Sequence, residues 1–244
     1  MQMLTLAKNV ANSFLNRVGL EVGRYRPEYD SQHRLVRSLN HFHINSVIDI
    51  GANQGQFAKG LRMLGYSGKI ISFEPLLEAH SLLIQNARKD RNWTVFERCA
   101  LGSENGVAKI NIAGNSVSSS VLSMAPVHSQ VLASSSYVAT DQVPIFRLDD
   151  VLPKESMESD QLFLKLDTQG YESQVLKGAT RTLQLARGLV VETSLTELYV
   201  GETLWLPMIH LLEELGFHVW SIDPGFTDNR IGRTLQCDFT FFRN

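Results

Sequence analysis

The sequence predicts an α/β fold: a doubly wound, Rossmann-like sheet whose strands are mostly parallel. Three observations lead to this prediction. Short apolar strands alternate with amphipathic helices of about 10 to 15 residues, which is typical of βαβ units. A glycine-containing turn follows the first strand, at the place where such folds bind nucleotide-like ligands. The chain has 244 residues, 43% of them hydrophobic, which is enough to bury one sizeable core.

The first 44 residues are predicted to form a helical segment ahead of the sheet. A helix over residues 3–18 would place five apolar side chains on one face: Leu4, Ala7, Ala11, Leu15 and Val18. A second helix, capped by Asp30 or Ser31, is expected to end near Phe42. We expect residues 1–44 to act as a cap on the domain or as a homodimer contact.

Residues 45–244 are predicted to form the main domain. Its strands are expected at 47–50, 69–73, 94–98, 161–166, 188–192, 217–222 and 235–242. Its helices are expected at 54–64, 77–89, 171–185 and 204–215, with Leu82, Leu83 and Ala87 of the second one facing the core. Since crossovers between parallel strands are right-handed, this order gives a doubly wound sheet that ends in a pair of strands.

The middle of the chain departs from this alternation. Residues 106–113 and 137–146 both read as strands, which makes residues 106–146 a β-excursion. The segment between the two strands is rich in serine and poor in charge. Long loops of this kind within a compact domain are often functional, so we expect a lid, with a solvent-facing linker as the alternative.

Composition excludes several classes of protein. The net charge is −2, which gives no sign of the basic surface that a nucleic-acid partner would need. The two cysteines, Cys99 and Cys237, are too few for a disulfide scaffold and fit a reducing, cytoplasmic location. The sequence has no apolar run of about 18 residues, so we expect no membrane span.

The stretch VIDIGANQGQF, residues 47–57, suggests the ligand. Asp49 precedes Gly51 and Gly55, and Glu74 follows the second strand in ISFEP. This spacing lacks the middle glycine of the dinucleotide fingerprint, and no P-loop lysine follows. A carboxylate at the turn would repel a pyrophosphate and favour a cationic group, while Glu74 is placed to accept from ribose hydroxyls. S-adenosylmethionine (SAM) combines these features, so SAM is the predicted cofactor.

The sequence resembles the FkbM family of class I SAM-dependent methyltransferases over about residues 45 to 243. The resemblance is carried by VIDIGANQGQF, ISFEP, CALG, LDDVL, LFLKLDTQGYESQVLKGA and VVETS. It implies a seven-stranded sheet with a final antiparallel hairpin. It also implies a methionine-binding set of Asp49, Gly51, Ala52 and Gly55, ribose binding by Glu74, and adenine contacts from Ala100 and Leu101. The predicted cofactor site is completed by Asn53, Phe57, Phe73, Pro75, Ser119 and, near the methyl group, Asp167.

Methyl transfer to a hydroxyl needs alignment and removal of a proton. Asp167 ends the apolar strand LFLKL and is the first candidate for the base. Lys165 precedes it by two residues, so both side chains should lie on the same side of the strand and pair. Glu172 and Glu192 could join Asp167 in a carboxylate cluster, and a Mg²⁺ ion held there is the less favoured alternative to a metal-free site.

Other polar and aromatic residues are weaker candidates. His128 lies in the expected lid and is the best placed histidine for a base. Four serines of the same segment could bind the substrate or the cofactor: Ser116, Ser118, Ser119 and Ser120. Four aromatic residues could stack on a sugar: Tyr25, Tyr29, Tyr199 and Trp205.

The resulting hypothesis is O-methylation of a hydroxyl on a small acceptor, such as a glycoside, polyketide or glycolipid. An N-methyltransferase acting on a small molecule and a non-catalytic interaction protein with a SAM-binding fold are the alternatives. We also expect that Asp49→Ala would abolish SAM binding and leave the fold intact.

Overall fold

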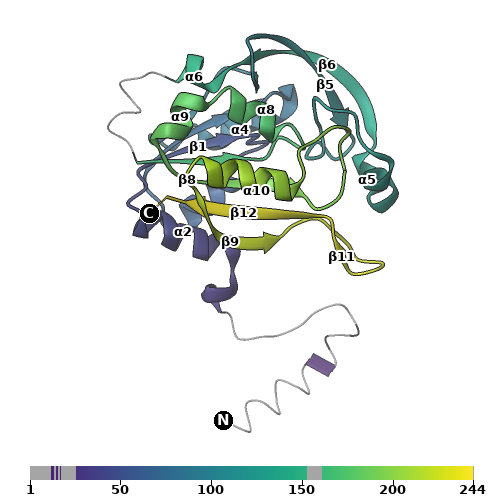
Figure 1. The fold of residues 1–244 in the computed structure, drawn as a ribbon, viewed down its shortest axis with the longest axis horizontal. Helices are drawn as coiled ribbons and strands as arrows, with labels where there is room; N and C mark the ends of the chain where they lie inside the picture. The colour runs from purple at the N-terminus through teal and green to yellow at the C-terminus, as the bar shows by residue number, and fades with distance from the viewer. Residues whose placement is uncertain (1–11, 14, 16, 18–25, 153–160, 244) are drawn as a thin grey trace. The chain divides into compact units, whose positions relative to one another are not determined.

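The computed structural model describes residues 12, 13, 15, 17, 26–152 and 161–243 (Figure 1). Two compact units divide the chain after Leu35, within helix α2 (Ser31–His41), and each is described by itself. In the first unit, the Asp30 carboxylate accepts the His33 amide at 2.9 Å, as the predicted N-cap of α2 does. Most of the predicted helix over 3–18, and with it the expected homodimer contact, lies outside the described residues.

The second unit is built on a seven-stranded sheet with the order β3-β2-β1-β7-β8-β12-β9. Neighbouring strands pair in parallel except for β12, which runs antiparallel to both β8 and β9. The predicted doubly wound sheet and its terminal antiparallel pair are therefore confirmed. The strand bounds are Ser46–Ile50 for β1, Lys69–Phe73 for β2, Trp93–Val95 for β3, Leu162–Leu166 for β7, Ala186–Ser194 for β8, His218–Pro224 for β9 and Gln236–Phe242 for β12.

Helices cover both faces of this sheet. One face carries an apolar core in which strand residues such as Leu164 and Val191 meet α8, α9 and α10 (Figure 1). On the other face, Phe42 stacks on Phe242 with ring centroids 4.0 Å apart. The helix bounds are Gln56–Met63 for α3, Leu77–Ala87 for α4, Leu148–Val151 for α6, Glu172–Lys177 for α8, Thr180–Leu185 for α9 and Trp205–Glu214 for α10.

The β-excursion forms a second, three-stranded sheet with the order β4-β6-β5. Strands β5 (Gly106–Ala113) and β6 (Tyr137–Phe146) have the predicted bounds and pair antiparallel, while β4 (Ala100–Leu101) runs parallel to β6. Helix α5 (Pro126–Val131) and the 3-10 helix η3 (Ala133–Ser135) lie between β5 and β6 in the chain. A small hairpin of β10 (Thr227–Asp228) and β11 (Arg233–Thr234) follows β9.

Two local predictions differ from the structure. The predicted helix over 171–185 is two helices, because the Asp149 carboxylate accepts the amides of Arg181 and Thr182 and so caps a new start at α9. In α4, Leu83 and Ala87 are buried as expected, but Leu82 is 39% exposed because it lies on the outer side of the helix. No helix in the part of the chain that the structure describes is long and apolar enough to cross a membrane.

Candidate active site at the edge of the sheet

A cavity of about 650 Å³ opens at the carboxyl ends of β1, β2 and β7. The strand order reverses between β1 and β7, and ligands of doubly wound folds bind at such a point. Nine residues of the predicted cofactor site line this cavity: Gly51, Asn53, Phe73, Glu74, Pro75, Ala100, Leu101, Ser119 and Asp167. Four others lie behind the lining: Asp49, Ala52, Gly55 and Phe57.

Glu74, directly after β2, is a buried carboxylate that faces the cavity. Its two oxygens accept the amide of Asn53 at 2.7 Å and the amide of Leu76 at 2.8 Å. Burial raises the pKa of Glu74 to about 7, and the two amide donors oppose that rise. Each oxygen keeps a further lone pair, so the carboxylate can still receive hydrogen bonds from a diol.

The turn after β1 is shaped by contacts within the protein. The amides of Gly51 and Ala52 both donate to the Phe73 carbonyl, at 3.1 and 3.0 Å. A Cβ on Gly51 would lie 1.8 Å from the Asp167 carbonyl oxygen, and one on Gly55 would lie 2.6 Å from the Trp93 ring. Close packing inside the protein therefore requires glycine at both positions, and the predicted binding of the methionine part by these glycines stays a prediction.

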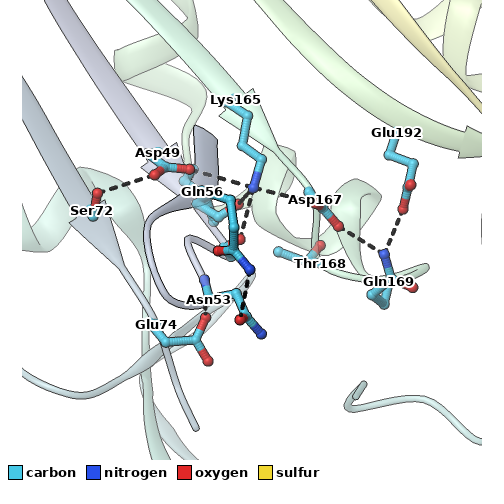
Figure 2. Close-up of polar contacts among 12 residues, drawn as sticks. Asp49, Asn53, Gln56, Ser72, Glu74, Lys165, Asp167, Thr168, Gln169 and Glu192 are labelled. Carbon is cyan, nitrogen blue, oxygen red and sulfur yellow. Dashed lines mark hydrogen bonds and ion pairs between the residues drawn. The ribbon is translucent and has the colours of Figure 1, made fainter. Parts of the chain in front are cut away.

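An ammonium group lies between two carboxylates next to this turn (Figure 2). The Lys165 Nζ atom is 3.4 Å from Asp49 Oδ1 and 3.3 Å from Asp167 Oδ2, and it donates to the Gly51 carbonyl at 2.7 Å. The predicted pairing of Lys165 with Asp167 is confirmed. Burial alone would lower the pKa of Lys165, but the Asp167 and Asp49 carboxylates outweigh burial and raise it. Lys165 is therefore a fixed cation.

Asp49 is fully buried and lies one layer behind the cavity. Its other oxygen accepts the Ser72 hydroxyl at 3.1 Å, and burial raises the pKa of Asp49 while Lys165 opposes the rise. Because Lys165 lies against Asp49 Oδ1, the carboxylate can act on a ligand through the lysine. The membership of Asp49 in the methionine-binding set stays a prediction, and this position indicates that it would act through Lys165 and the turn.

This position changes the expected outcome for an Asp49 variant. We predict that Asp49→Asn lowers the free energy of unfolding by about 1 to 3 kcal/mol, because Lys165 loses the buried one of its two carboxylate partners. Affinity for SAM should fall about tenfold, since the charge near the cationic cofactor becomes less negative. Urea denaturation and calorimetry measure the two effects. If Asp49→Asn loses SAM binding completely while its stability is unchanged, Asp49 instead contacts the methionine part of SAM directly.

Gln169 connects the carboxylates that were expected to cluster. Its Nε2 donates to Asp167 Oδ1 at 2.8 Å and to Glu192 Oε2 at 2.6 Å (Figure 2). Glu172 turns away and accepts the amides of Thr168 and Gly170. The three acids therefore do not converge, and the described residues contain no group of three or more His, Cys, Asp or Glu side chains that could hold a metal ion.

His128 does not face the cavity from a lid. It is 2% exposed, and its ring packs edge-on against Tyr199 with centroids 5.2 Å apart. Burial lowers the pKa of His128 to about 4, so we do not retain it as a base. The aromatic candidates for stacking also lie elsewhere: Tyr199 is fully buried, Trp205 stacks on Phe239, and Tyr25 lies outside the described residues.

The serine-rich segment covers the cavity and is held in place. Residues 116–121 contribute five lining residues: Ser116, Val117, Ser119, Ser120 and Val121. Ser120 pairs with Asn111 through backbone hydrogen bonds in both directions, and its hydroxyl donates to the Gln169 carbonyl at 2.7 Å. Asn53 reaches Ser116 at 3.4 Å from the opposite wall. This segment is therefore tied to both sides of the site.

Gln169 is a residue of the site that was not predicted. It lies in the lining, directly before Gly170, and adopts a left-handed backbone conformation with φ 55°. Its Oε1 accepts the Tyr199 hydroxyl at 2.5 Å. The only signal in the sequence was its position in DTQG between the strand acid and the glycine.

Comparisons with known proteins agree with this geometry. The family model described as "Methyltransferase FkbM domain" matches residues 49–219, well over half of the chain. The 2-O-methyltransferase NoeI of Sinorhizobium fredii (strain NBRC 101917 / NGR234) is 28% identical over 189 residues, which cover 75% of this chain and 76% of that protein.

Solved structures of low sequence identity are also similar. Magnesium protoporphyrin IX methyltransferase (ChlM) from Synechocystis PCC 6803, solved with bound SAM, has a TM-score of 0.47 at 11% identity, covering 98% of this chain and 96% of that one. Precorrin-6y C5,15-methyltransferase from Geobacter metallireducens GS-15 has a TM-score of 0.45 at 13% identity, covering 87% of each chain. From the match of the family model, the chain belongs to the FkbM family of SAM-dependent methyltransferases.

Proposed function

We propose that the enzyme transfers a methyl group from SAM to a hydroxyl of a small acceptor such as a sugar or another secondary metabolite. The observation that carries this proposal is the cavity itself, which is lined by both Glu74 and Asp167. Its lining combines apolar side chains with a few polar groups, as is usual for small-molecule sites. The similarity to a 2-O-methyltransferase supports oxygen as the methyl acceptor.

The lining fits the chemical groups of SAM. Glu74 is suited to the ribose diol, and the apolar side chains of Phe73, Leu101 and Ile110 suit a flat adenine ring. Asp49, Lys165 and Asp167 together carry a formal charge of −1, which suits a ligand with a net positive charge. These features support SAM as the ligand of the cavity.

In the proposed reaction, bound SAM supplies an electrophilic methyl group on its sulfonium. Asp167 would accept a hydrogen bond from the acceptor hydroxyl and would receive its proton when the hydroxyl oxygen is methylated. Lys165 fixes one Asp167 oxygen and Gln169 fixes the other, so the carboxylate is held in one orientation. Positioning of this kind accounts for a large part of the rate enhancement in a direct displacement.

Calorimetric titration with SAM and with its product S-adenosylhomocysteine (SAH) tests the proposal. We expect dissociation constants of about 1 to 100 μM, near physiological levels. A positive result justifies a screen of polyhydroxylated acceptors, in which methylated product is identified by mass spectrometry. A folded protein that binds neither compound would refute the assignment of the cavity.

Glu74 predicts how SAH binding depends on pH. A ribose diol favours the ionised carboxylate, so affinity should rise as the pH increases through about 7 and then level off. The stability of the protein without ligand should change in the opposite direction. Because the pKa of Glu74 is raised in the folded state, its contribution to the free energy of unfolding falls as the pH rises from 4.5 to about 7.

Titrations with SAH between about pH 5.5 and 8.5 measure the effect of Glu74. Glu74→Gln should weaken SAH binding by about tenfold or more. The NH₂ group of the glutamine would face one of the two backbone amides that donate to Glu74, and two donors cannot bond to each other. The variant should also lose the step near pH 7. An unchanged pH profile in Glu74→Gln would assign the step to another group.

A further inference from the structure

The amide of Gln169 joins two acids on neighbouring strands. Its Nε2 donates to Asp167 Oδ1, which follows β7, and to Glu192 Oε2, on β8 (Figure 2). Both contacts are short, at 2.8 and 2.6 Å. The amide can face only this way, since the reverse orientation would set its oxygen against two carboxylates.

Tyr199 fixes the other end of this amide. Its hydroxyl donates to Gln169 Oε1 at 2.5 Å, and the side chain is fully buried. A Cβ on Gly170 would lie 2.8 Å from Tyr199 Cβ, so the backbone that follows Gln169 packs directly on the tyrosine. The tyrosine therefore holds both the side chain and the turn of Gln169.

The two acids need such a device because their surroundings are mostly anionic. Burial first, and then the Asp167 carboxylate, raise the pKa of Glu192 well above its ordinary value. Charged groups on four elements interact electrostatically with this pair: Asp49 on β1, Lys165 on β7, Glu172 on α8 and Asp238 on β12. Hydrogen bonds to an ionised carboxylate favour the ionised form, so the Gln169 amide opposes uptake of a proton by Glu192.

We propose that Gln169, oriented by Tyr199, is a positioning residue that holds the Asp167 and Glu192 carboxylates in fixed orientation beside the site of methyl transfer. This inference rests on the proposed function, because it requires the methyl group of SAM to lie at Asp167. Neither residue needs to take part in the chemistry. Each acts on the acceptor through the two acids.

Sinefungin provides a probe that requires no acceptor. This SAM analogue carries an amine in place of the sulfonium methyl, so its affinity relative to SAH reports the negative charge at the methyl position. Effects of Glu74 on the nucleoside part cancel in the ratio. The variants are Gln169→Asn, Tyr199→Phe and the double variant, titrated with both ligands between about pH 6 and 8.5.

The substitutions are chosen to leave the fold intact. Asparagine tolerates the left-handed backbone of position 169, but it is one methylene shorter and cannot span both acids. Tyr66→Phe is the matched control: Tyr66 is buried, lies between α3 and β2 in the chain and does not line the cavity. Thermal unfolding of each variant confirms that it is folded.

We expect Gln169→Asn to lower the ratio of sinefungin to SAH affinity about tenfold near pH 7, and Tyr199→Phe about threefold. The loss should shrink as the pH rises and Glu192 ionises. If Tyr199 acts through Gln169, the double variant should match Gln169→Asn alone. Tyr66→Phe should leave the ratio unchanged.

The outcomes separate the two proposals. A wild-type protein that binds neither SAH nor sinefungin overturns the proposed function, and the inference with it. If the wild type binds both ligands but the ratio is unchanged in Gln169→Asn, the inference alone is wrong. Fully additive effects in the double variant, or a loss that does not vary with pH, would also overturn it, because both describe a merely structural contribution.

Discussion

Alanine at position 51 is expected to prevent stable folding. The added Cβ would lie 1.8 Å from the carbonyl oxygen of Asp167, and position 51 has a φ of +74°. Hydrogen bonds hold the backbone at both residues. The Gly51 amide donates to the Phe73 carbonyl, and the Asp167 amide donates to the Ile50 carbonyl at 3.2 Å. We predict a loss of more than about 4 kcal/mol in the free energy of unfolding, which is most of the stability of a typical domain.

Gly65→Ala is the control for this experiment. Gly65 also has a positive φ, of +89°, but a Cβ there would meet nothing within 4 Å. Its substitution therefore measures the backbone strain alone, which is about 1 kcal/mol. Urea denaturation followed by circular dichroism compares the two variants. If Gly51→Ala and Gly65→Ala have equal stability, the packing explanation is wrong. If Gly51→Ala is also unable to bind SAH, glycine at position 51 is needed for contact with the ligand.

The fold could be predicted from the sequence because its signals are local. Each of the strands β1, β2 and β7 is a short apolar run bounded by a helix signal or a turn, and these runs were located to within a residue or two. The hairpin of β5 and β6 was placed with its observed bounds for the same reason. The pairing order of the seven strands is not local and was not predicted; the family resemblance implied only a seven-stranded sheet with a final antiparallel hairpin.

The reasons for individual residues were harder to predict. Asp49 and the two glycines were correctly marked as special, but their contacts are with Lys165, Asp167 and the Trp93 ring, which lie far away in the chain. A pattern of residue types shows that a carboxylate or a glycine is needed. It does not show which distant group imposes the need.

The acids of the site illustrate the same limit. Strand ends placed Asp167 and Glu192 at one edge of the sheet, as parallel strands require. Nothing in the spacing indicated that Gln169 separates them, or that Glu172 turns back to the amides of its own loop. His128 differs from expectation for a related reason: the loop-like sequence around it folds into helix α5, and His128 is the buried residue of that helix.

Asp167→Asn is expected to reduce kcat by about 10² to 10⁴, the usual contribution of a positioned acid or base. Asparagine has nearly the same shape, but it cannot carry the charge that receives the hydroxyl proton. Its NH₂ group must also face either the Lys165 ammonium or the Gln169 amide, both of which are donors. Affinity for SAH should change by less than about tenfold, because Glu74 and the rest of the lining are intact.

The measurement is single-turnover methyl transfer from labelled SAM to an acceptor found by screening. Asp150→Asn is the matched control, since Asp150 is an exposed acid on α6 that bonds Asn105 at 2.9 Å and does not line the cavity. If Asp167→Asn keeps most of its turnover, the proton must leave by another route. Glu192 is then the group to test, because its Oε2 takes the Gln169 donor while the carboxylate faces the same edge of the sheet. A large loss in Glu192→Gln together with a small one in Asp167→Asn would make Asp167 the residue that orients the acceptor and Glu192 the residue that takes its proton.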